Sequence, residues 1–325
     1  MTVKDQQIEK FLTAIDKART IALFSHVNPD GDTCGSALAL YRALKTYGKQ
    51  PYVFCDGVFN DKLKYLDGLD DYNKQEFSPC DLAIAVDCSD DGRLGAYDRA
   101  YYSCRYGIFV DHHISRGKRG DLNIVETDAA ATAEVVFDLI SAMDKRKKCM
   151  DDVIAKLLYC ALVTDTGGFS FSSVTQKTLL TAASLIVYDF KANDIFNNFM
   201  KLVDYSVFNL RNRVLSAAKL YDDGAIAGIF FKKEDFEATG TTEADTEGII
   251  NNILNISGVK IAFSITETKG DMQYKVSFRT VDGVDANEIA GIFGGGGHKN
   301  AAGCRVSGFF EDVKDKILKA CRDCI

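Results

Sequence analysis

The alternation of short apolar runs with helical patterns along the first 190 residues constrains the fold most strongly. Strands that alternate with helices favour a parallel, doubly wound α/β sheet. The run LAIAVD is apolar at almost every position, as expected for a strand buried on both faces. The predicted strands are 21–25, 51–55, 82–87, 106–111 and 123–126, and the predicted helices are 34–47, 131–142, 151–164 and 175–188.

The pattern changes after Gly224, where alternating β-rich segments predict a smaller α+β domain. The sequence TKGD at 268–271 has the Gly and Asp of a hairpin turn. We therefore predict a catalytic domain at 1–190, a connecting helix or linker at 191–220 and a second domain at 221–325. The strands expected in the second domain are 225–231, 260–268 and 273–281, with helices at 243–255, 285–293 and 310–322.

Charge and hydropathy exclude several classes of protein. With 46 acidic and 39 basic residues the net charge is −7, which argues against a broad basic face for long duplex nucleic acid. No apolar stretch of about 18 residues occurs, so no membrane span is expected. The N-terminal segment has the pattern of an amphipathic helix and lacks the apolar core and cleavage site of a signal peptide. We expect a cytoplasmic protein.

Ten cysteines are present, and most lie in apolar runs, where a reducing cytosol leaves them as small core residues. Cys321 and Cys324 form one CxxC pair without a second pair to accompany it. Packing is the favoured role for this pair, and a zinc or redox role is the alternative.

Polar clusters follow three of the predicted strands. His26, Asp30 and Asp32 follow the first, Asp87 follows the third, and the DHH tripeptide at 111–113 ends the fourth. Ligands in open α/β sheets bind outside the carboxyl ends of the strands, so these segments are expected to converge on one crevice. Asp165, at the end of the 151–164 helical pattern, is a further candidate.

Four carboxylates in one crevice need positive charge, because like charges at close range cannot all stay ionised. The carboxylates are those of Asp30, Asp32, Asp87 and Asp165. Two divalent cations bridged by a shared Asp and a water would balance them and would suit phosphoryl hydrolysis. Carboxylate and imidazole ligands favour Mn²⁺, with Mg²⁺, Zn²⁺ or Co²⁺ as alternatives. Each motif alone also fits a helix cap, a turn or a solvated loop, but their conjunction favours a metal site.

A second candidate site lies near the C-terminus. The run Gly294, Gly295, Gly296, Gly297 lets backbone amides approach a ligand closely, and such a nest binds anions. His298 adds a donor, and Arg279 can fork onto a phosphate or stack on a base. The alternative is a turn that leads into a final strand.

Taken in order, HVNPDGDTCGS, AVDCSD, DHH and VTDTGG resemble the four motifs of the DHH phosphoesterases. GGGGHKNAAG and Arg279 resemble the glycine-rich motif and substrate-binding arginine of the DHHA1 domain. The resemblance implies that Asp111 orients a histidine and that His113 contacts the scissile phosphate. It implies one metal on His26, Asp30 and Asp87, and another on Asp32, Asp87, His112 and Asp165. Arg116, just after the DHH tripeptide, is a candidate phosphate ligand, and an exposed loop arginine is the alternative.

Within this family, a compact chain with both domains most resembles the bifunctional oligoribonucleases and pAp phosphatases. The resemblance implies hydrolysis of short single-stranded RNA to mononucleotides and of 3′-phosphoadenosine 5′-phosphate (pAp) to AMP. It also implies a homodimer. The nearest alternative is a stand-alone phosphodiesterase for cyclic di-AMP or pApA. A RecJ-like exonuclease and a non-catalytic nucleotide-binding protein are further alternatives.

Overall fold

The computed structural model describes residues 3–88, 91–113, 120–268, 270, 272–281 and 283–325. The chain divides into two compact units, one ending at Leu202 and the other starting at Val203. The division falls inside the segment that we predicted to connect two domains. Each unit contains its own sheet.

The first unit contains a five-stranded sheet in the order β2-β1-β3-β4-β5, and every neighbouring pair is parallel. The predicted parallel α/β fold is confirmed. The strands are β1 (Thr20–Ser25), β2 (Gln50–Phe54), β3 (Leu82–Val86), β4 (Gly107–Asp111) and β5 (Leu122–Val125). The helices are α1 (Val3–Lys17), α2 (Gly31–Tyr47), α3 (Asp98–Ser103), α4 (Thr132–Arg146), α5 (Asp152–Asp165), α6 (Gln176–Leu185) and α7 (Ala192–Phe196).

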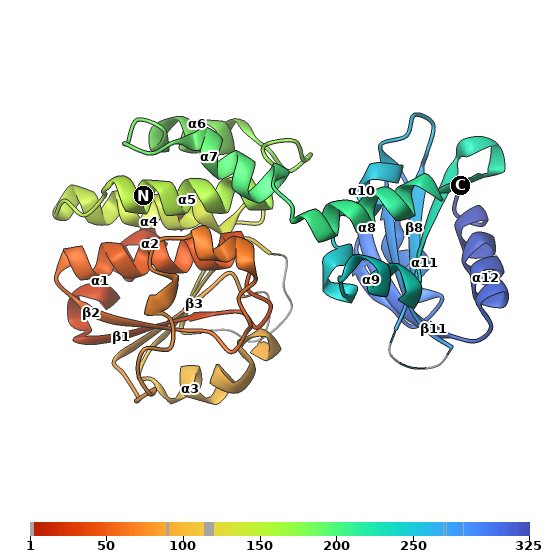
Figure 1. The fold of residues 1–325 in the computed structure, drawn as a ribbon. Helices are drawn as coiled ribbons and strands as arrows, with labels where there is room; N and C mark the ends of the chain where they lie inside the picture. Colours follow the sequence, from red (N-terminus) through yellow and green to blue (C-terminus); the bar gives the residue numbers. More distant parts are fainter. Residues whose placement is uncertain (1–2, 89–90, 114–119, 269, 271, 282) are drawn as a thin grey trace. The chain divides into compact units, whose positions relative to one another are not determined.

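Alternate residues of each strand enter different cores, because successive side chains of a strand point to opposite faces. Ile21 and Leu23 of β1 pack into the larger core beneath α1, α2, α4 and α5. Ala22 and Phe24 pack into a smaller core with residues of α3. Figure 1 shows α1, α2, α4 and α5 on one face of the sheet and α3 on the other. The sheet is buried on both faces, although unequally.

The order of the strands reverses between β1 and β3. The chain runs from β1 through α2 to β2, which lies on one side of β1. It runs from β3 through α3 to β4, which lies on the opposite side of the β1–β3 pair. Right-handed connections in opposite directions place α2 and α3 on opposite faces and open a crevice at this point. His26 directly follows β1, and Asp87 directly follows β3.

The second unit contains a mixed six-stranded sheet in the order β10-β11-β9-β8-β7-β6, in which only the β7–β8 pair is parallel. Helices α11 and α12 cover one face, and α8 and α10 cover the other. The strands are β6 (Lys219–Tyr221), β7 (Ile226–Phe231), β8 (Ile261–Glu267), β9 (Gln273–Thr280), β10 (Gly296–His298) and β11 (Ala301–Ser307). The helices are α8 (Tyr205–Ser216), α9 (Lys233–Thr239), α10 (Ile249–Leu254), α11 (Ala286–Gly291) and α12 (Phe310–Arg322).

The predicted continuous helix at 191–220 is wrong. After α7 the chain forms one π-helical turn at Asn197–Lys201, and the backbone is extended at Leu202 and again at Asp204, just before α8. The last residues of the segment form β6. The predicted helix at 243–255 is also divided, because Gly248 adopts a left-handed conformation with φ of 75°.

The predicted hairpin joins β8 to β9, which pair antiparallel. Lys269 and Asp271 of its turn lie outside the described residues. Among the residues that are described, no helix is both long and apolar enough to cross a bilayer.

Candidate metal centre

Two glycines bring the N-terminus of α2 against α5. A Cβ atom at Gly31 would lie 2.4 Å from Cγ2 of Thr164, and one at Gly35 would lie 2.7 Å from a backbone carbonyl oxygen of α5. Only glycine allows such a close approach of the two helices. This packing places Asp32, in the first turn of α2, near Asp165, the last residue of α5.

The first group of candidate ligands consists of His26, Asp30 and Asp87. Nε2 of His26 lies 3.7 Å from Oδ2 of Asp30 and 3.5 Å from Oδ2 of Asp87. Asp30 is also the N-cap of α2, and its Oδ1 accepts a hydrogen bond from the amide of Thr33 at 3.0 Å. The helix-cap role and the proximity to His26 use different oxygens of the same carboxylate.

The second group consists of Asp32, His112 and Asp165. Nε2 of His112 lies 3.3 Å from Oδ2 of Asp165 and 3.8 Å from Oδ1 of Asp87. In each group the potential ligand atoms lie within 4.8 Å of one another. The structure therefore brings together all six residues that the sequence predicts as metal ligands, which come from four separate segments.

The ring of His112 is oriented in the way that a metal ligand requires. Its Nδ1 lies 3.1 Å from the carbonyl oxygen of Ala129, which can only accept, so Nδ1 carries the proton. Nε2 then presents its lone pair, and this buried atom has no hydrogen-bond partner in the described structure. Metal-bound histidines commonly donate their other ring nitrogen to a carbonyl or carboxylate in this manner. The donor set thus fits a divalent cation.

Thr132, at the start of α4, contacts two of the acidic residues and was missed by the sequence analysis. Its hydroxyl donates to Oδ1 of Asp87 at 2.7 Å, and its amide donates to Oδ2 of Asp32 at 2.7 Å. The amide of Ala133 donates to Oδ1 of Asp32 at 3.0 Å. Because Ala131 at the N-cap position of α4 has no capping side chain, Asp32 supplies this function from α2.

Burial and like charges make the acidic cluster difficult to ionise without a cation. Burial, together with the charges of neighbouring aspartates, raises the pKa of Asp32 well above its usual value. Burial is also the main cause that raises the pKa of Asp165 to about 6. Asp87 is as buried as Asp32, but the three histidines around it overcome this effect and lower its pKa. These shifts are those expected of carboxylates gathered for a positive ligand.

The carboxylate of Asp111 contacts the ring of His113 and not the ring of His112. Oδ1 of Asp111 lies 2.8 Å from Nδ1 of His113 and accepts the backbone amide of His112 at 2.8 Å. Burial lowers the pKa of His113, but the hydrogen bond to Asp111 and nearby negative charge outweigh it and raise the pKa. The remaining nitrogen, Nε2, is left for another partner. Arg116, predicted to bind phosphate, lies outside the described residues.

The glycine-rich segment of the second domain differs from an open anion nest. The amide of Gly294 donates to Gly291 O at 3.0 Å, and that of Gly295 donates to Ala290 O at 3.0 Å. The amide of Gly297 donates to Oδ1 of Asn287 at 2.9 Å. Three of the four predicted amide donors are therefore used within the protein.

The glycines instead allow β10 to lie close to β11. A Cβ atom at Gly295 would lie 2.2 Å from the carbonyl oxygen of Gly303, and Gly297 has a φ of 156°. Gly296 pairs with Gly303 in this ladder. His298 of β10 and Arg279 of β9 both pair with Ala301 of β11, which lies between these two strands. The two residues therefore lie at the same level of the sheet. Arg279 is half-buried, and burial lowers the pKa of its guanidinium.

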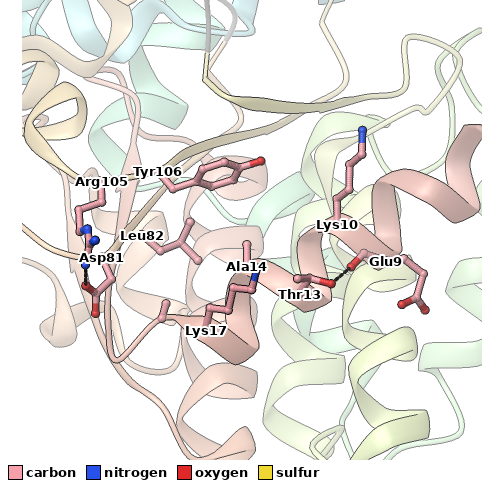
Figure 2. A pocket seen from close by; sticks show the side chains of 10 residues that line it. Glu9, Lys10, Thr13, Ala14, Lys17, Asp81, Leu82, Arg105 and Tyr106 are labelled. Carbon is pink, nitrogen blue, oxygen red and sulfur yellow. Dashed lines mark hydrogen bonds and ion pairs between the residues drawn. The ribbon is translucent and has the colours of Figure 1, made fainter.

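Two other features do not belong to the metal cluster. Cys321 packs in the core of the second unit, where burial raises the pKa of its thiol to about 12, and the metal-binding groups found among the described residues include neither Cys321 nor Cys324. A cavity of about 550 Å³ lies between α1 and the amino ends of β3 and β4, near Leu82 and Tyr106 (Figure 2). The metal cluster lies at the carboxyl ends of the same strands.

Two solved structures share the fold. An exopolyphosphatase-related protein from Bacteroides fragilis is 28% identical with a TM-score of 0.91, and the match covers 98% of this chain and 96% of that chain. The exonuclease RecJ bound to manganese is 14% identical with a TM-score of 0.57, and the match covers 99% of this chain and 95% of that chain.

Sequence comparison identifies the same two domains. Residues 20–162 match the N-terminal domain of the DHH family, and residues 227–325 match the DHHA1 domain. The bifunctional oligoribonuclease and PAP phosphatase NrnA of Bacillus subtilis (strain 168) is 31% identical over 299 residues, which cover 92% of each chain. With both domains present and this relative matched over almost its whole length, the chain belongs to the DHH/DHHA1 phosphoesterase family.

Proposed function

We propose that this protein is a metal-dependent phosphoesterase that hydrolyses short oligoribonucleotides to mononucleotides and pAp to AMP. The proposal is supported by the name of the Bacillus subtilis relative, a bifunctional oligoribonuclease and PAP phosphatase that matches nearly the whole chain. It is also supported by a net charge of −7, which disfavours long polyanions at a distance and favours a substrate of a few nucleotides.

One observation carries the proposal of two metals: the two oxygens of Asp87 face different histidines. Oδ2 lies 3.5 Å from Nε2 of His26, and Oδ1 lies 3.8 Å from Nε2 of His112. A carboxylate between two ligand groups can bridge two cations. His26 and Asp30 would hold one ion, and Asp32, His112 and Asp165 would hold the other.

Two divalent cations at these residues would supply charge neutralisation and an activated water for attack on phosphorus. Mn²⁺ suits the mixed carboxylate and imidazole donors, with Mg²⁺ or Co²⁺ as alternatives. The RecJ exonuclease that shares the fold was solved with manganese bound.

His113 would serve the substrate and not a metal. Its Nδ1 is held by Asp111, so its Nε2 can donate a hydrogen bond to a phosphate oxygen. From this position His113 could act as a hydrogen-bond donor or general acid toward the phosphate. Asp111 would fix the ring in the orientation that this role requires.

Arg279 is the residue of the second domain best suited to a phosphate or base. Its side chain is half-buried on β9, where Nη1 donates a hydrogen bond to the carbonyl oxygen of Phe278 at 2.9 Å. A guanidinium has several donors, so others remain for a bidentate contact with phosphate. We propose that Arg279, with the glycine segment and His298, anchors the terminal nucleotide.

A turnover panel tests the substrate. The full chain is incubated with Mn²⁺ and, separately, with pAp, pApA, a five-nucleotide RNA, cyclic di-AMP and pyrophosphate. Release of AMP from pAp and of mononucleotides from RNA is expected. Exclusive cleavage of cyclic di-AMP or pApA would replace this proposal with the phosphodiesterase alternative. Exclusive cleavage of pyrophosphate would contradict the assignment of the second domain to nucleotide binding.

A second experiment tests the metal site directly. Asp87→Asn is compared with Asp70→Asn, an exposed acid in the same unit, by calorimetric titration with Mn²⁺. Asp87→Asn is expected to lose high-affinity binding and turnover, whereas Asp70→Asn should retain both. Equal Mn²⁺ affinity in the two variants would overturn the proposed bridging role. Chelation of the wild type should abolish turnover, and added Mn²⁺ should restore it.

A further inference from the structure

Two cysteines meet at the amino ends of β3 and β4, away from the metal cluster. Cys80 precedes β3, and Cys104 lies at the C-cap of α3, shortly before β4. Their sulfur atoms are 2.7 Å apart, and the amide of Arg105 donates to the carbonyl oxygen of Cys80 at 3.1 Å. A backbone hydrogen bond thus holds the two segments together beside the two thiols.

The two thiols differ in exposure, although both belong to the smaller core of the first unit. Cys80 is only 6% exposed, whereas Cys104 is half-buried. Cys104 is therefore the residue of the pair that a reagent from solvent can reach more readily.

We propose that Cys80 and Cys104 form a peroxide-reactive dithiol site that is oxidised reversibly to an intramolecular disulfide. The contact between the sulfurs needs to shorten only from 2.7 Å to about 2.05 Å for a bond to form. Both cysteines are free thiols in the described structure. The site is independent of the proposed phosphoesterase activity.

The electrostatics of the pair indicate which sulfur reacts first. The hydrogen bond with Cys80 lowers the pKa of Cys104 to about 7, and the same contact together with burial raises the pKa of Cys80. The direction of this shift and the greater exposure of Cys104 both favour this cysteine as the first of the pair to react. Thiolate character and access are what select a cysteine for oxidation by peroxide.

The reaction balances with hydrogen peroxide as the only oxidant. The Cys104 thiolate attacks one oxygen, the O–O bond breaks, and the departing hydroxide takes a proton to leave as water. The resulting sulfenic acid is attacked by the sulfur of Cys80, which forms the S–S bond and releases a second water as the S–O bond breaks. Two thiols lose two electrons, and one peroxide becomes two waters. A dithiol reductant reverses the oxidation.

Differential alkylation of the full chain tests the proposal. The reduced protein is treated with hydrogen peroxide, remaining thiols are blocked with N-ethylmaleimide, and non-reducing peptide mapping follows. The expected result is one linked peptide pair containing Cys80 and Cys104, a loss of two hydrogen atoms from the intact mass, and full recovery after dithiothreitol. Reduced Cys104 should also be alkylated faster at pH 7 than Cys324, which is buried to a similar extent.

Variants provide the controls. Cys104→Ser should abolish the cross-link, and Cys324→Ser should leave it unchanged. Since the peptide map of the wild type alone decides whether the link forms, a folding defect in Cys104→Ser would not remove the test. Recovery of both cysteines as alkylated thiols after peroxide treatment would overturn the proposal. So would oxidation of Cys104 to sulfinic acid without a link to Cys80.

Discussion

The hydroxyl of Thr132 donates a hydrogen bond to Oδ1 of Asp87 across 2.7 Å, in a fully buried position. Asp87 has a positive φ of 62°, which is uncommon for a residue other than glycine. The backbone conformation of Asp87 and the hydrogen bond from Thr132 together fix the position of this carboxylate. Thr132 belongs to α4, so this helix fixes the orientation of the proposed bridging ligand.

Thr132→Val should weaken the metal site, because it removes the hydrogen bond to Asp87 and keeps the shape of the side chain. Loss of such a supporting contact typically lowers metal affinity or activity by about 10–100-fold. Thr132→Ser should retain most of both. Mn²⁺ titration of turnover measures the effect, and Thr181→Val, a buried threonine of α6, is the matched control. Equal metal dependence of Thr132→Val and Thr181→Val would contradict this role.

Gly31→Ala should destabilise the first domain and reduce turnover, since its Cβ would lie 2.4 Å from Cγ2 of Thr164. Forcing an extra carbon into a packed contact costs about 1–3 kcal/mol. Urea denaturation measures the free energy of unfolding. Gly291→Ala is the control, because no atom lies within 4 Å of its added Cβ. If the two variants were equally stable, close packing of α2 on α5 would not be required.

The metal-free protein should lose stability as pH rises from about 6.5 to 9. Burial disfavours a charged His26, but Asp30 and Asp87 outweigh it and raise the pKa of His26 to about 9. A group with a raised folded-state pKa contributes stability that is complete below its unfolded value of about 6.5 and is lost as pH passes the folded value. Urea denaturation in the presence of a chelator measures this decline.

His26→Gln is the comparison for this pH dependence. Its free energy of unfolding should fall less than that of the wild type over the same interval, because the titrating imidazole is gone. Mn²⁺ affinity of the wild type should rise across this interval, since a metal ligand must be neutral. Parallel pH profiles for wild type and variant would show that His26 does not titrate as described.

Arg279→Ala should raise KM for pAp by about 10–100-fold, which corresponds to the loss of a hydrogen bond to a charged group. The concentration of Mn²⁺ that gives half-maximal turnover should not change, because Arg279 lies in the other compact unit from the metal ligands. Arg305→Ala removes an exposed arginine from β11 of the same sheet and serves as the control. Identical KM values for the two variants would exclude Arg279 from substrate binding.

The strands and the metal cluster could be predicted because their signals are local. The apolar run of β3 reports its burial on both faces, and the polar residues that follow strands report the edge where they meet. Helix boundaries at 191–220 could not be predicted, because the spacing of apolar residues continues through Leu202 and Asp204 while the backbone there is extended.

Contacts between distant segments were the main omission. Thr132 lies 45 residues from Asp87 and 100 residues from Asp32, and its own neighbours Ala131 and Ala133 carry no polar side chain. Only the packing of α4 against α2 brings these groups together. The glycine run was over-interpreted for the same reason. The sequence shows that its backbone amides are not covered by side chains, but it does not show that acceptors in the protein, such as Asn287, bind these amides.

The capping of α4 by Asp32 links the chemistry of the site to the local opening of a helix. The amides of Thr132 and Ala133 exchange with solvent only when the Asp32 carboxylate releases them. A cation that fixes this carboxylate would slow the exchange of both amides, and a substitution that frees it would speed the exchange. The rate of hydrogen exchange at these two amides in the first turn of α4 would thus report whether a cation occupies the acidic cluster.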